Sequence, residues 1–457
     1  MARVIIVGAG ISGLATAAFL DNVDTLVFES SDSHGGNVRT DRIDGRILDR
    51  AANGWLDSEP AMTKLLEKLN LSDQIIPVSE RAEIRWIYAD GRMQPAPLSP
   101  KEMLTTSLIP WWAKLRILLE PFIFRGRKET DETVAQFVSR RLGKWFVDRF
   151  VGPMVAGIHA ARPESLSLKA AFPKMAAMER DYGSLFRAMF AKKRGGAPSG
   201  HLQTLQAGAG QLTDTLAQYL GEGLQCDMPV EGLTQTKEGW VVHTKSGEHL
   251  ADAVVLACPA PAQAKLMRGL DASVAEALDN IEYAPVTVVV SVWAAGSFDQ
   301  APNGFGVLVA RGEDVGVLGT LFTSCAFPQQ CPEGEIILRT MVGGSVNPKA
   351  ASLPHEQLLE LVFAAQEKFL GTQRADPILV RVYRHAAGIP QYTLGHTTRT
   401  ATVNAAEAKF PGLFFAGNHL DGIGVKDCVG TGHRIAQNVQ GWLEITAPVE
   451  QATTETQ

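Results

Sequence analysis

The part of the sequence that constrains the fold most is the stretch that ends at Glu29. Residues 3–7 (Arg-Val-Ile-Ile-Val) are almost wholly apolar and rich in β-branched side chains, which indicates a buried parallel strand. A glycine-rich turn follows at residues 8–13 (Gly-Ala-Gly-Ile-Ser-Gly), and residues 14–20 predict a helix. A second strand at residues 25–28 leads into Glu29. This order of strand, turn, helix, strand and acidic residue predicts a βαβ unit that binds a dinucleotide.

The glycines of this turn have separate roles. Gly8 permits the tight turn, Gly10 lets the backbone approach a pyrophosphate, and Gly13 lets the helix pack closely on the strand. The start of the helix presents unpaired N–H groups to phosphates, and Glu29 can accept hydrogen bonds from ribose hydroxyls. An ordinary glycine-rich turn is the alternative, but every contextual requirement of the motif is met. The candidate cofactor-binding residues of this unit are Gly8, Gly10, Ile11, Ser12, Gly13, Glu29 and Ser30.

A second glycine pair follows Glu29 within residues 34–40 (His-Gly-Gly-Asn-Val-Arg-Thr). It resembles the pair found after the ribose acid in flavoproteins of the glutathione-reductase and amine-oxidase type. In that family the two glycines, here Gly35 and Gly36, lie along the FAD pyrophosphate, and a basic residue that follows helps to screen it. The resemblance implies FAD as the cofactor and adds Gly35, Gly36 and Asn37 to its candidate site.

Composition excludes several classes of function. With 43 Lys and Arg against 49 Asp and Glu the net charge is −6, so nucleic acid is not an expected partner. The 5 cysteines contain no Cys-x-x-Cys pair, so we expect neither a zinc site nor a disulfide framework, and reduced thiols indicate a cytoplasmic location. We expect no signal peptide, no transmembrane segment and a disordered polar tail at residues 448–457. The 457 residues are enough for two or three domains.

The character of the chain changes at Pro95, after which helix formers dominate to about Lys193. Residues 101–128 mix apolar and aromatic side chains with Lys and Arg, and residues 133–150 predict another amphipathic helix. The first stretch suits either a helix pair on a membrane surface or a helical subdomain that buries its apolar side chains. From the sequence we favour burial, since such stripes usually belong to a core. Peripheral membrane contact through residues 101–128 is the alternative.

Strand patterning returns after a loop at residues 192–200. Strands are expected at residues 241–244, 253–257, 286–293, 304–309, 315–320 and 336–342, and a helix at 355–370. Residues 412–418 have the form of a strand that leads into a glycine turn, and a helix follows at 430–444. Because this second strand–turn–helix unit lies far from the first, we expect a nucleotide-binding domain assembled from both chain ends.

Two stretches near the C-terminus resemble the protoporphyrinogen oxidase family: residues 386–396 (Ala-Ala-Gly-Ile-Pro-Gln-Tyr-Thr-Leu-Gly-His) and residues 415–429, which begin Phe-Ala-Gly-Asn. Other matches extend from residue 3 to about residue 443. The resemblance implies an α/β fold with a Rossmann-like FAD-binding domain, a mixed α+β substrate domain and a helical, membrane-surface-type domain. On this scheme the FAD-binding domain takes residues 1–82, 199–275 and 393–447, the substrate domain takes 83–94 and 276–392, and the helical domain takes 95–198.

The resemblance also implies further site residues. Glu29 matches the acid at the adenosine ribose, Val230 matches the residue whose backbone holds the adenine, and Gly424 and Val425 match the helix start that faces the flavin pyrimidine. The cofactor-binding residues added in this way are Asn53, Gly54, Trp55, Val230, Gly417, Asn418, Gly424 and Val425.

By the same resemblance the substrate is a tetrapyrrole with carboxylate side chains, which needs a wide aliphatic slot with cations at its mouth. Arg85 matches the family arginine that pairs with a propionate. Gly157, Gly306, Leu308 and Met341 match positions beside the macrocycle. Without the resemblance, Arg85 would be expected on a solvated edge strand and the other four in a core.

The implied reaction is the six-electron oxidation of protoporphyrinogen IX to protoporphyrin IX in haem or chlorophyll synthesis, with O₂ as the acceptor and H₂O₂ as a product. The flavin is the reactive group, so no catalytic side chain is assigned. Ala51-Ala52 and Trp55 depart from the family pattern, which leaves coproporphyrinogen III as an alternative substrate. A flavin amine oxidase or desaturase and a non-catalytic tetrapyrrole-binding flavoprotein are further alternatives. The oligomeric state and the hand-over of product to a metal chelatase stay open.

The histidines show no spacing typical of metal ligands, so no metal is expected. We expect them to be structural histidines with satisfied hydrogen bonds. This applies to His159, His385, His396 and His419.

Overall fold

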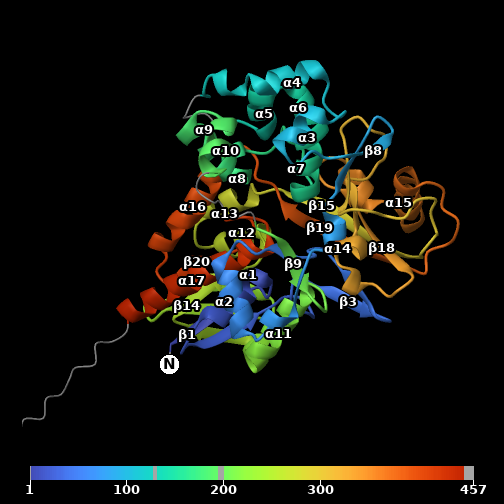
Figure 1. Cartoon of the computed structure of the whole chain (residues 1–457). Helices are drawn as coiled ribbons and strands as arrows, with labels where there is room; N and C mark the ends of the chain where they lie inside the picture. Colours follow the sequence, from blue (N-terminus) through green and yellow to red (C-terminus); the bar gives the residue numbers. More distant parts are fainter. Residues whose placement is uncertain (1, 127–130, 194–199, 447–457) are drawn as a thin grey trace, which may run out of the picture.

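The computed structural model describes residues 2–126, 131–193 and 200–446, which are built around two large β-sheets (Figure 1). The first sheet has the order β10-β2-β1-β14-β20 and is parallel throughout. Its strands are β1 (Arg3–Val7), β2 (Asp24–Phe28), β10 (Leu224–Gln225), β14 (Ala253–Leu256) and β20 (Leu413–Phe415). They come from both ends of the chain, which confirms the α/β fold predicted from the two strand–turn–helix units.

Helices cover both faces of the first sheet. On one face α1 (Ile11–Phe19) packs against the C-terminal helix α17 (Val425–Thr446), with α2 (Pro60–Lys68) and α11 (Gly210–Leu220) beside them (blue, green and red in Figure 1). On the other lie α12 (Ala260–Met267), α13 (Ala272–Asp279), α16 (His396–Lys409) and a small sheet of β11 (Val230–Gln235), β12 (Trp240–Thr244) and β13 (Gly247–Ala251). An apolar core fills the space on each side.

The second sheet has the order β19-β15-β18-β17-β16-β7-β8, and its neighbouring strands are antiparallel except β16 and β7. Its strands are β7 (Arg85–Ala89), β8 (Arg92–Pro95), β15 (Tyr283–Ala294), β16 (Gly306–Val309), β17 (Gly319–Phe322), β18 (Glu335–Gly343) and β19 (Leu379–Pro390). Helix α15 (His355–Leu370) packs on one face. The hairpin of β3 (Thr40–Ile43) and β4 (Arg46–Asp49) packs on the other face, together with α7 (Gly152–His159).

A third, short sheet of β5 (Trp55–Leu56), β9 (Leu202–Leu205) and β6 (Ile75–Pro77) lies between these parts, and α14 (Thr323–Ala326) follows β17. Most predicted strands are confirmed. The strand expected at residues 315–320 is misplaced, because β17 begins only at Gly319. Strand β19 was not predicted, since it is an edge strand in which charged and apolar residues mix.

Residues 100–126 and 131–193 form a helical region (cyan to green in Figure 1). Its helices are α3 (Pro100–Thr105), α4 (Trp111–Leu118), α5 (Val134–Leu142), α6 (Lys144–Phe146), α7, α8 (Leu168–Ala171), α9 (Pro173–Tyr182) and α10 (Leu185–Lys193). The single helix predicted at residues 133–150 is wrong. Gly143, with φ 94°, separates α5 from α6, and a π-helical turn at Val147–Val151 leads into α7.

Three predictions concern residues outside the described ranges. They are most of the loop predicted at residues 192–200, of which 194–199 are not described and 192–193 belong to α10; the basic residues Arg127 and Lys128 of the amphipathic stretch; and the tail at residues 448–457.

The apolar side chains of residues 101–126 are only partly buried, so the burial favoured from the sequence is wrong for most of the large ones. Leu108, Ile109, Ala113 and Ile117 are buried. The exposed large side chains are Leu104, Trp111, Trp112, Leu115, Leu118, Leu119, Phe122 and Phe124, with Trp111 at 74 % and Phe124 at 92 % exposure. Helix α4 thus buries one thin stripe and turns its other apolar side chains outward. Within the described residues, no helix combines the length and apolarity needed to span a bilayer.

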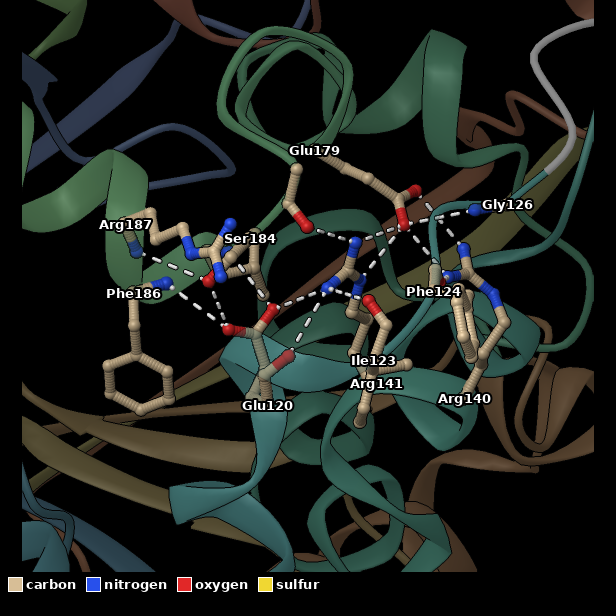
Figure 2. Close-up of polar contacts among 12 residues, drawn as sticks. Glu120, Ile123, Phe124, Gly126, Arg140, Arg141, Glu179, Ser184, Phe186 and Arg187 are labelled. Atoms are coloured by element: carbon tan, nitrogen blue, oxygen red, sulfur yellow. Dashed lines mark hydrogen bonds and ion pairs between the residues drawn. The ribbon is translucent and has the colours of Figure 1, made fainter.

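A buried ionic network holds the segment that carries these side chains (Figure 2). Arg141 on α5 is fully buried and pairs with Glu120 (2.9 Å) and with Glu179 on α9 (2.5 Å). Glu120 also accepts hydrogen bonds from Ser184 Oγ and from the N–H of Leu185. Both carboxylates and the guanidinium find their partners within the protein. The network therefore fixes the backbone at Glu120, although the side chains of the nearby Leu119 and Phe122 face outward.

Candidate active site

The turn after β1 is closely packed at two of its glycines and open at the third. Gly8 has φ 111°, and a Cβ placed there would lie 2.8 Å from the backbone nitrogen of Cys258. A Cβ on Gly13 would lie 2.0 Å from the carbonyl oxygen of Gly8. A Cβ on Gly10 would meet no atom within 4 Å. The turn therefore excludes side chains where helix and strand meet, and it leaves open space where a pyrophosphate would approach.

Glu29 is held at the carboxyl end of β2. Its Oε2 accepts the N–H of Ala9 (2.8 Å), and its Oε1 accepts the N–H of Ser31 (2.9 Å) and bonds from the hydroxyls of Ser30 and Ser31. The backbone oxygen of Glu29 accepts the N–H of Met228 (2.8 Å), which brings the chain that leads to Val230 beside it. The proposed ribose and adenine positions are thus neighbours.

The second glycine pair lies against the first turn. The N–H of Gly35 donates to the carbonyl of Ala9 (2.8 Å), and a Cβ on Gly36 would lie 3.4 Å from the Cα of Gly10. Gly35 has φ 94° and Gly36 has φ 54°, conformations that glycine adopts without strain. The two glycine-rich segments therefore form one surface that lacks side chains.

Asn37 joins this surface to the second sheet. Its Nδ2 donates to the carbonyl of Gly388 on β19 (3.3 Å), and its carbonyl accepts the N–H of Ala52 (3.3 Å). Shortly after Ala52, Asn53 Nδ2 and Trp55 Nε1 are buried with no hydrogen-bond partner among the described residues. Buried donors without an acceptor are destabilising, so both fit a site that a polar cofactor completes.

The C-terminal candidates lie at the edge of the same region. Gly417 follows β20 with φ 140°, and the carbonyl of Asn418 accepts the hydroxyl of Tyr392 (2.5 Å). Gly424 directly precedes α17, which begins at Val425. The start of this long helix offers N–H groups and a partial positive charge, which fits an electron-rich ring edge. Taken together, the open glycine surface and the unpaired donors fit FAD.

The candidate substrate residues share one face of the second sheet. Leu308 pairs with Gly319, and Gly319 pairs with Met341, so Leu308 and Met341 flank a glycine in one row. A Cβ on Gly157 of α7 would lie 2.7 Å from Leu308 Cδ2, so α7 covers this face at Leu308. The hairpin β3–β4 packs on the same face beside Met341.

Arg85 begins β7 and pairs with Gly306, which lies two residues before Leu308 and therefore on the same face. Its guanidinium carbon is 5.6 Å from the centre of the Phe305 ring. Among the described residues Arg85 has no carboxylate partner, so the cation at this exposed end of the face is free to bind an anion.

A cluster of buried rings, absent from the sequence prediction as a cluster, is formed where the end of α7, the segment after β19 and the start of α16 meet. His396 stacks on Tyr392 with 4.1 Å between the ring centres, and the ring centre of His159 is 6.3 Å from that of Tyr392. Both ring nitrogens of His396 and the Nδ1 atoms of His159 and His419 have no described partner. The hydrogen bonds predicted for these histidines are therefore missing at His396 and incomplete at His159 and His419. His419 Nε2 meets Gln263 Oε1 (3.3 Å), and His385 Nε2 meets the carbonyl of Arg50 (3.1 Å).

Burial controls the charge of these rings. It lowers the pKa of His159 to about 4, and that of His419 to about 3. Burial, with the charge of Arg399, lowers the pKa of His396 to about 4. Burial also raises the pKa of Tyr392. All four rings are therefore neutral near pH 7, which suits an apolar wall better than a set of acids and bases.

Comparison with known proteins agrees with these features. The model of the flavin-containing amine oxidoreductase family matches residues 11–440. Protoporphyrinogen oxidase 2, chloroplastic/mitochondrial, of Arabidopsis thaliana is 30 % identical over 97 % of this chain and 94 % of its own. Coproporphyrinogen III oxidase of Propionibacterium freudenreichii is 32 % identical over 96 % of this chain and 90 % of its own. A crystal structure from Exiguobacterium sp. 255-15 has the same fold, with a TM-score of 0.83 at 24 % identity, covering 97 % of this chain and 99 % of that one.

Proposed function

The chain belongs to the protoporphyrinogen oxidase group of the flavin-containing amine oxidoreductase family and is an FAD-dependent oxidoreductase, and we propose that it oxidises a porphyrinogen to the corresponding porphyrin. The first candidate substrate is protoporphyrinogen IX, oxidised by six electrons to protoporphyrin IX. Three O₂ would accept these electrons as three H₂O₂. The observation that carries the proposal is the convergence of Arg85, Leu308 and Met341 on the sheet face that Asn37 connects to the glycine surface.

In this proposal the protein positions the substrate against the cofactor and keeps water out of the site. Bound FAD would supply the hydride acceptor. Gly10 and Gly36 would leave room for its pyrophosphate, and the unpaired donors of Asn53 and Trp55 would bind its polar atoms. Leu308 and Met341 would hold the macrocycle against the flavin and exclude water.

Mixing the purified, FAD-loaded protein with protoporphyrinogen IX and O₂ tests the proposal. We expect porphyrin fluorescence and peroxide to rise together, at a rate well above that of an FAD-stripped control. Equal rates in the two samples would refute porphyrinogen oxidation. Oxidation of simple amines in place of porphyrinogens would favour an amine oxidase.

Coproporphyrinogen III is the second candidate substrate. The relative from Propionibacterium freudenreichii carries that activity in its name, and it matches this chain over nearly its whole length. Parallel turnover measurements with the two porphyrinogens decide between them.

We further propose that the exposed side chains of α3, α4 and the segment after them contact a membrane surface from the cytoplasmic side. Trp111, Leu118 and Phe122 present a wide apolar surface, with Lys101 and Arg116 exposed beside it. Sedimentation with anionic lipid vesicles tests this. Serine substitution of Trp111, Leu118 and Phe122 should abolish sedimentation, whereas the control Leu250→Ser, on exposed β13, should not. Equal sedimentation of both variants would contradict the proposal.

A further inference from the structure

Arg339 is the one charged residue in the β18 stretch Ile-Ile-Leu-Arg-Thr-Met-Val, and it lies two residues before Met341. The two side chains therefore lie on the same face of the sheet. Across the sheet, Arg339 pairs with Leu321, Leu321 pairs with Gly306, and Gly306 pairs with Arg85, so these residues form one row. Strands β18 and β7 are three strand spacings apart, which puts the Cα atoms of Arg339 and Arg85 roughly 14 Å from each other.

Arg339 is buried without a partner. It is 5 % exposed, and its Nε is enclosed with no hydrogen-bond acceptor. No ion pair joins it to any residue in the part of the chain that the structure describes. A guanidinium cannot shed its proton in a protein, so the charge stays in place even though burial lowers its pKa. Such a cation destabilises the fold unless an anion reaches it.

Asp49 of the hairpin is the carboxylate whose charge acts on Arg339, but other groups already engage it. Its Oδ1 accepts the hydroxyl of Thr40 (2.5 Å) and the N–H of Ala209 (3.0 Å). Burial raises the pKa of Asp49, which weakens it as a counter-ion. These hydrogen bonds to Oδ1 hold the hairpin to the segment before α11, and within the described residues no hydrogen bond or ion pair joins Asp49 to the guanidinium of Arg339.

We propose that Arg339 binds a second carboxylate of the substrate, three strands along the same face from Arg85. This inference rests on the proposed function and narrows its substrate class. Two cations three strands apart on one face match a macrocycle with carboxylates on opposite edges, as in coproporphyrinogen III. Protoporphyrinogen IX carries both carboxylates on one edge, so it can engage Arg85 but leaves Arg339 unpaired. Arg339 thereby favours the tetracarboxylate.

The test is steady-state kinetics of the full, FAD-loaded chain carrying Arg339→Met, with both porphyrinogens. We expect KM for coproporphyrinogen III to rise about tenfold or more, and KM for protoporphyrinogen IX to change less than about threefold. Arg339→Lys should recover part of the loss. The flavin absorbance should stay unchanged, and the melting temperature should stay equal or rise, because the variant removes an unpaired buried charge.

Arg381→Met is the matched control. Arg381 lies on β19 in the same row, separated from Arg339 by Val290, and its guanidinium donates to the neighbouring carbonyl of Val380. Its replacement removes the same charge and should leave both KM values unchanged.

Three results would overturn the proposal: an equal rise of KM for both substrates, a loss of bound FAD in Arg339→Met, or a lower melting temperature with unchanged KM values. Failure of the proposed function is distinguishable, because the unsubstituted protein would then turn over neither porphyrinogen. In that case fluorescence titration with coproporphyrin and protoporphyrin still tests Arg339. Selective loss of coproporphyrin affinity in Arg339→Met would support the carboxylate site, and equal affinities would exclude it.

Discussion

Arg141 and Arg339 are both buried arginines, and their surroundings are opposite. Arg141 meets two carboxylates and three backbone carbonyls inside the helical region (Figure 2). Arg339 meets no described partner on the face that carries the candidate substrate residues. A satisfied buried charge holds a fold together, whereas an unsatisfied one lowers stability and is explained by a ligand. The difference separates a structural cation from one that fits a binding role.

The histidine cluster is a third case. His159, His396 and His419 are as deeply buried as the two arginines and lack partners at one or both ring nitrogens. An imidazole avoids the free-energy cost of a buried charge by losing its proton, which a guanidinium cannot do. Only Arg339 therefore keeps an uncompensated charge in this comparison.

The largest expected loss of stability is that of Arg141→Met, which tests whether the paired arginine holds the fold together. The substitution leaves Glu120 buried without a cation and leaves Glu179 with Arg140 alone, so the free energy of unfolding should fall by about 3–5 kcal/mol. Denaturant titration measures it. The control Arg268→Met breaks the surface pair with Asp279 and should cost less than about 1 kcal/mol. Similar losses in the two variants would remove the distinction between buried and surface pairs.

The next effect depends on pH and concerns His396. Its pKa is about 4 in the folded protein against 6.5 for an ordinary histidine, so the unfolded chain binds the proton first. The stabilisation that the neutral His396 ring contributes is fully present above pH 6.5. It is lost as the pH falls from 6.5 toward 4, and this contribution changes no further below pH 4. The loss from this ring is at most about 3 kcal/mol.

His396→Phe tests this, because phenylalanine can keep the stack on Tyr392 without binding a proton. We expect the melting temperature of the variant to fall less steeply between pH 6.5 and 4 than that of the unsubstituted protein. The slope should not vanish, since His159 and His419 are buried in the same way. An unchanged slope would show that His396 already has a partner.

A smaller effect is expected at Arg85 on the substrate face. Arg85→Ala should weaken substrate binding by about 1–3 kcal/mol through the loss of a charge-assisted hydrogen bond, seen as a higher KM with little change in stability. Arg92→Ala, an exposed arginine on the neighbouring strand β8, serves as the control. If both variants keep the original KM, Arg85 is not the carboxylate ligand.

The smallest change in stability is expected from Asp49→Asn, which tests whether Arg339 is unpaired. Asparagine Oδ1 can still accept from Thr40 and Ala209, and the lost attraction to Arg339 is offset by removal of a buried charge. The free energy of unfolding should therefore change by less than about 1 kcal/mol. A loss as large as that of Arg141→Met would identify Asp49 as the true counter-ion of Arg339.

The N-terminal βαβ unit could be predicted in detail because its signals are local. The conformational roles expected of Gly8 and Gly13 appear directly, since a side chain at either position would collide with backbone. The edge strand β19 escaped prediction because its charged residues obscure the alternation. In β18, one arginine among apolar residues was the available sign of Arg339, but it could not show whether a carboxylate lay opposite.

The sequence by itself determined the parallel sheet, its glycine-rich turns and its assembly from both chain ends, because apolar runs and glycine conformations act within a few residues. Tertiary structure alone decided that α4 turns Trp111 and Leu118 outward, that Arg141 finds two carboxylates and that Arg339 finds none. Those outcomes depend on residues distant in the chain, and burial and charge pairing are properties of the packed molecule.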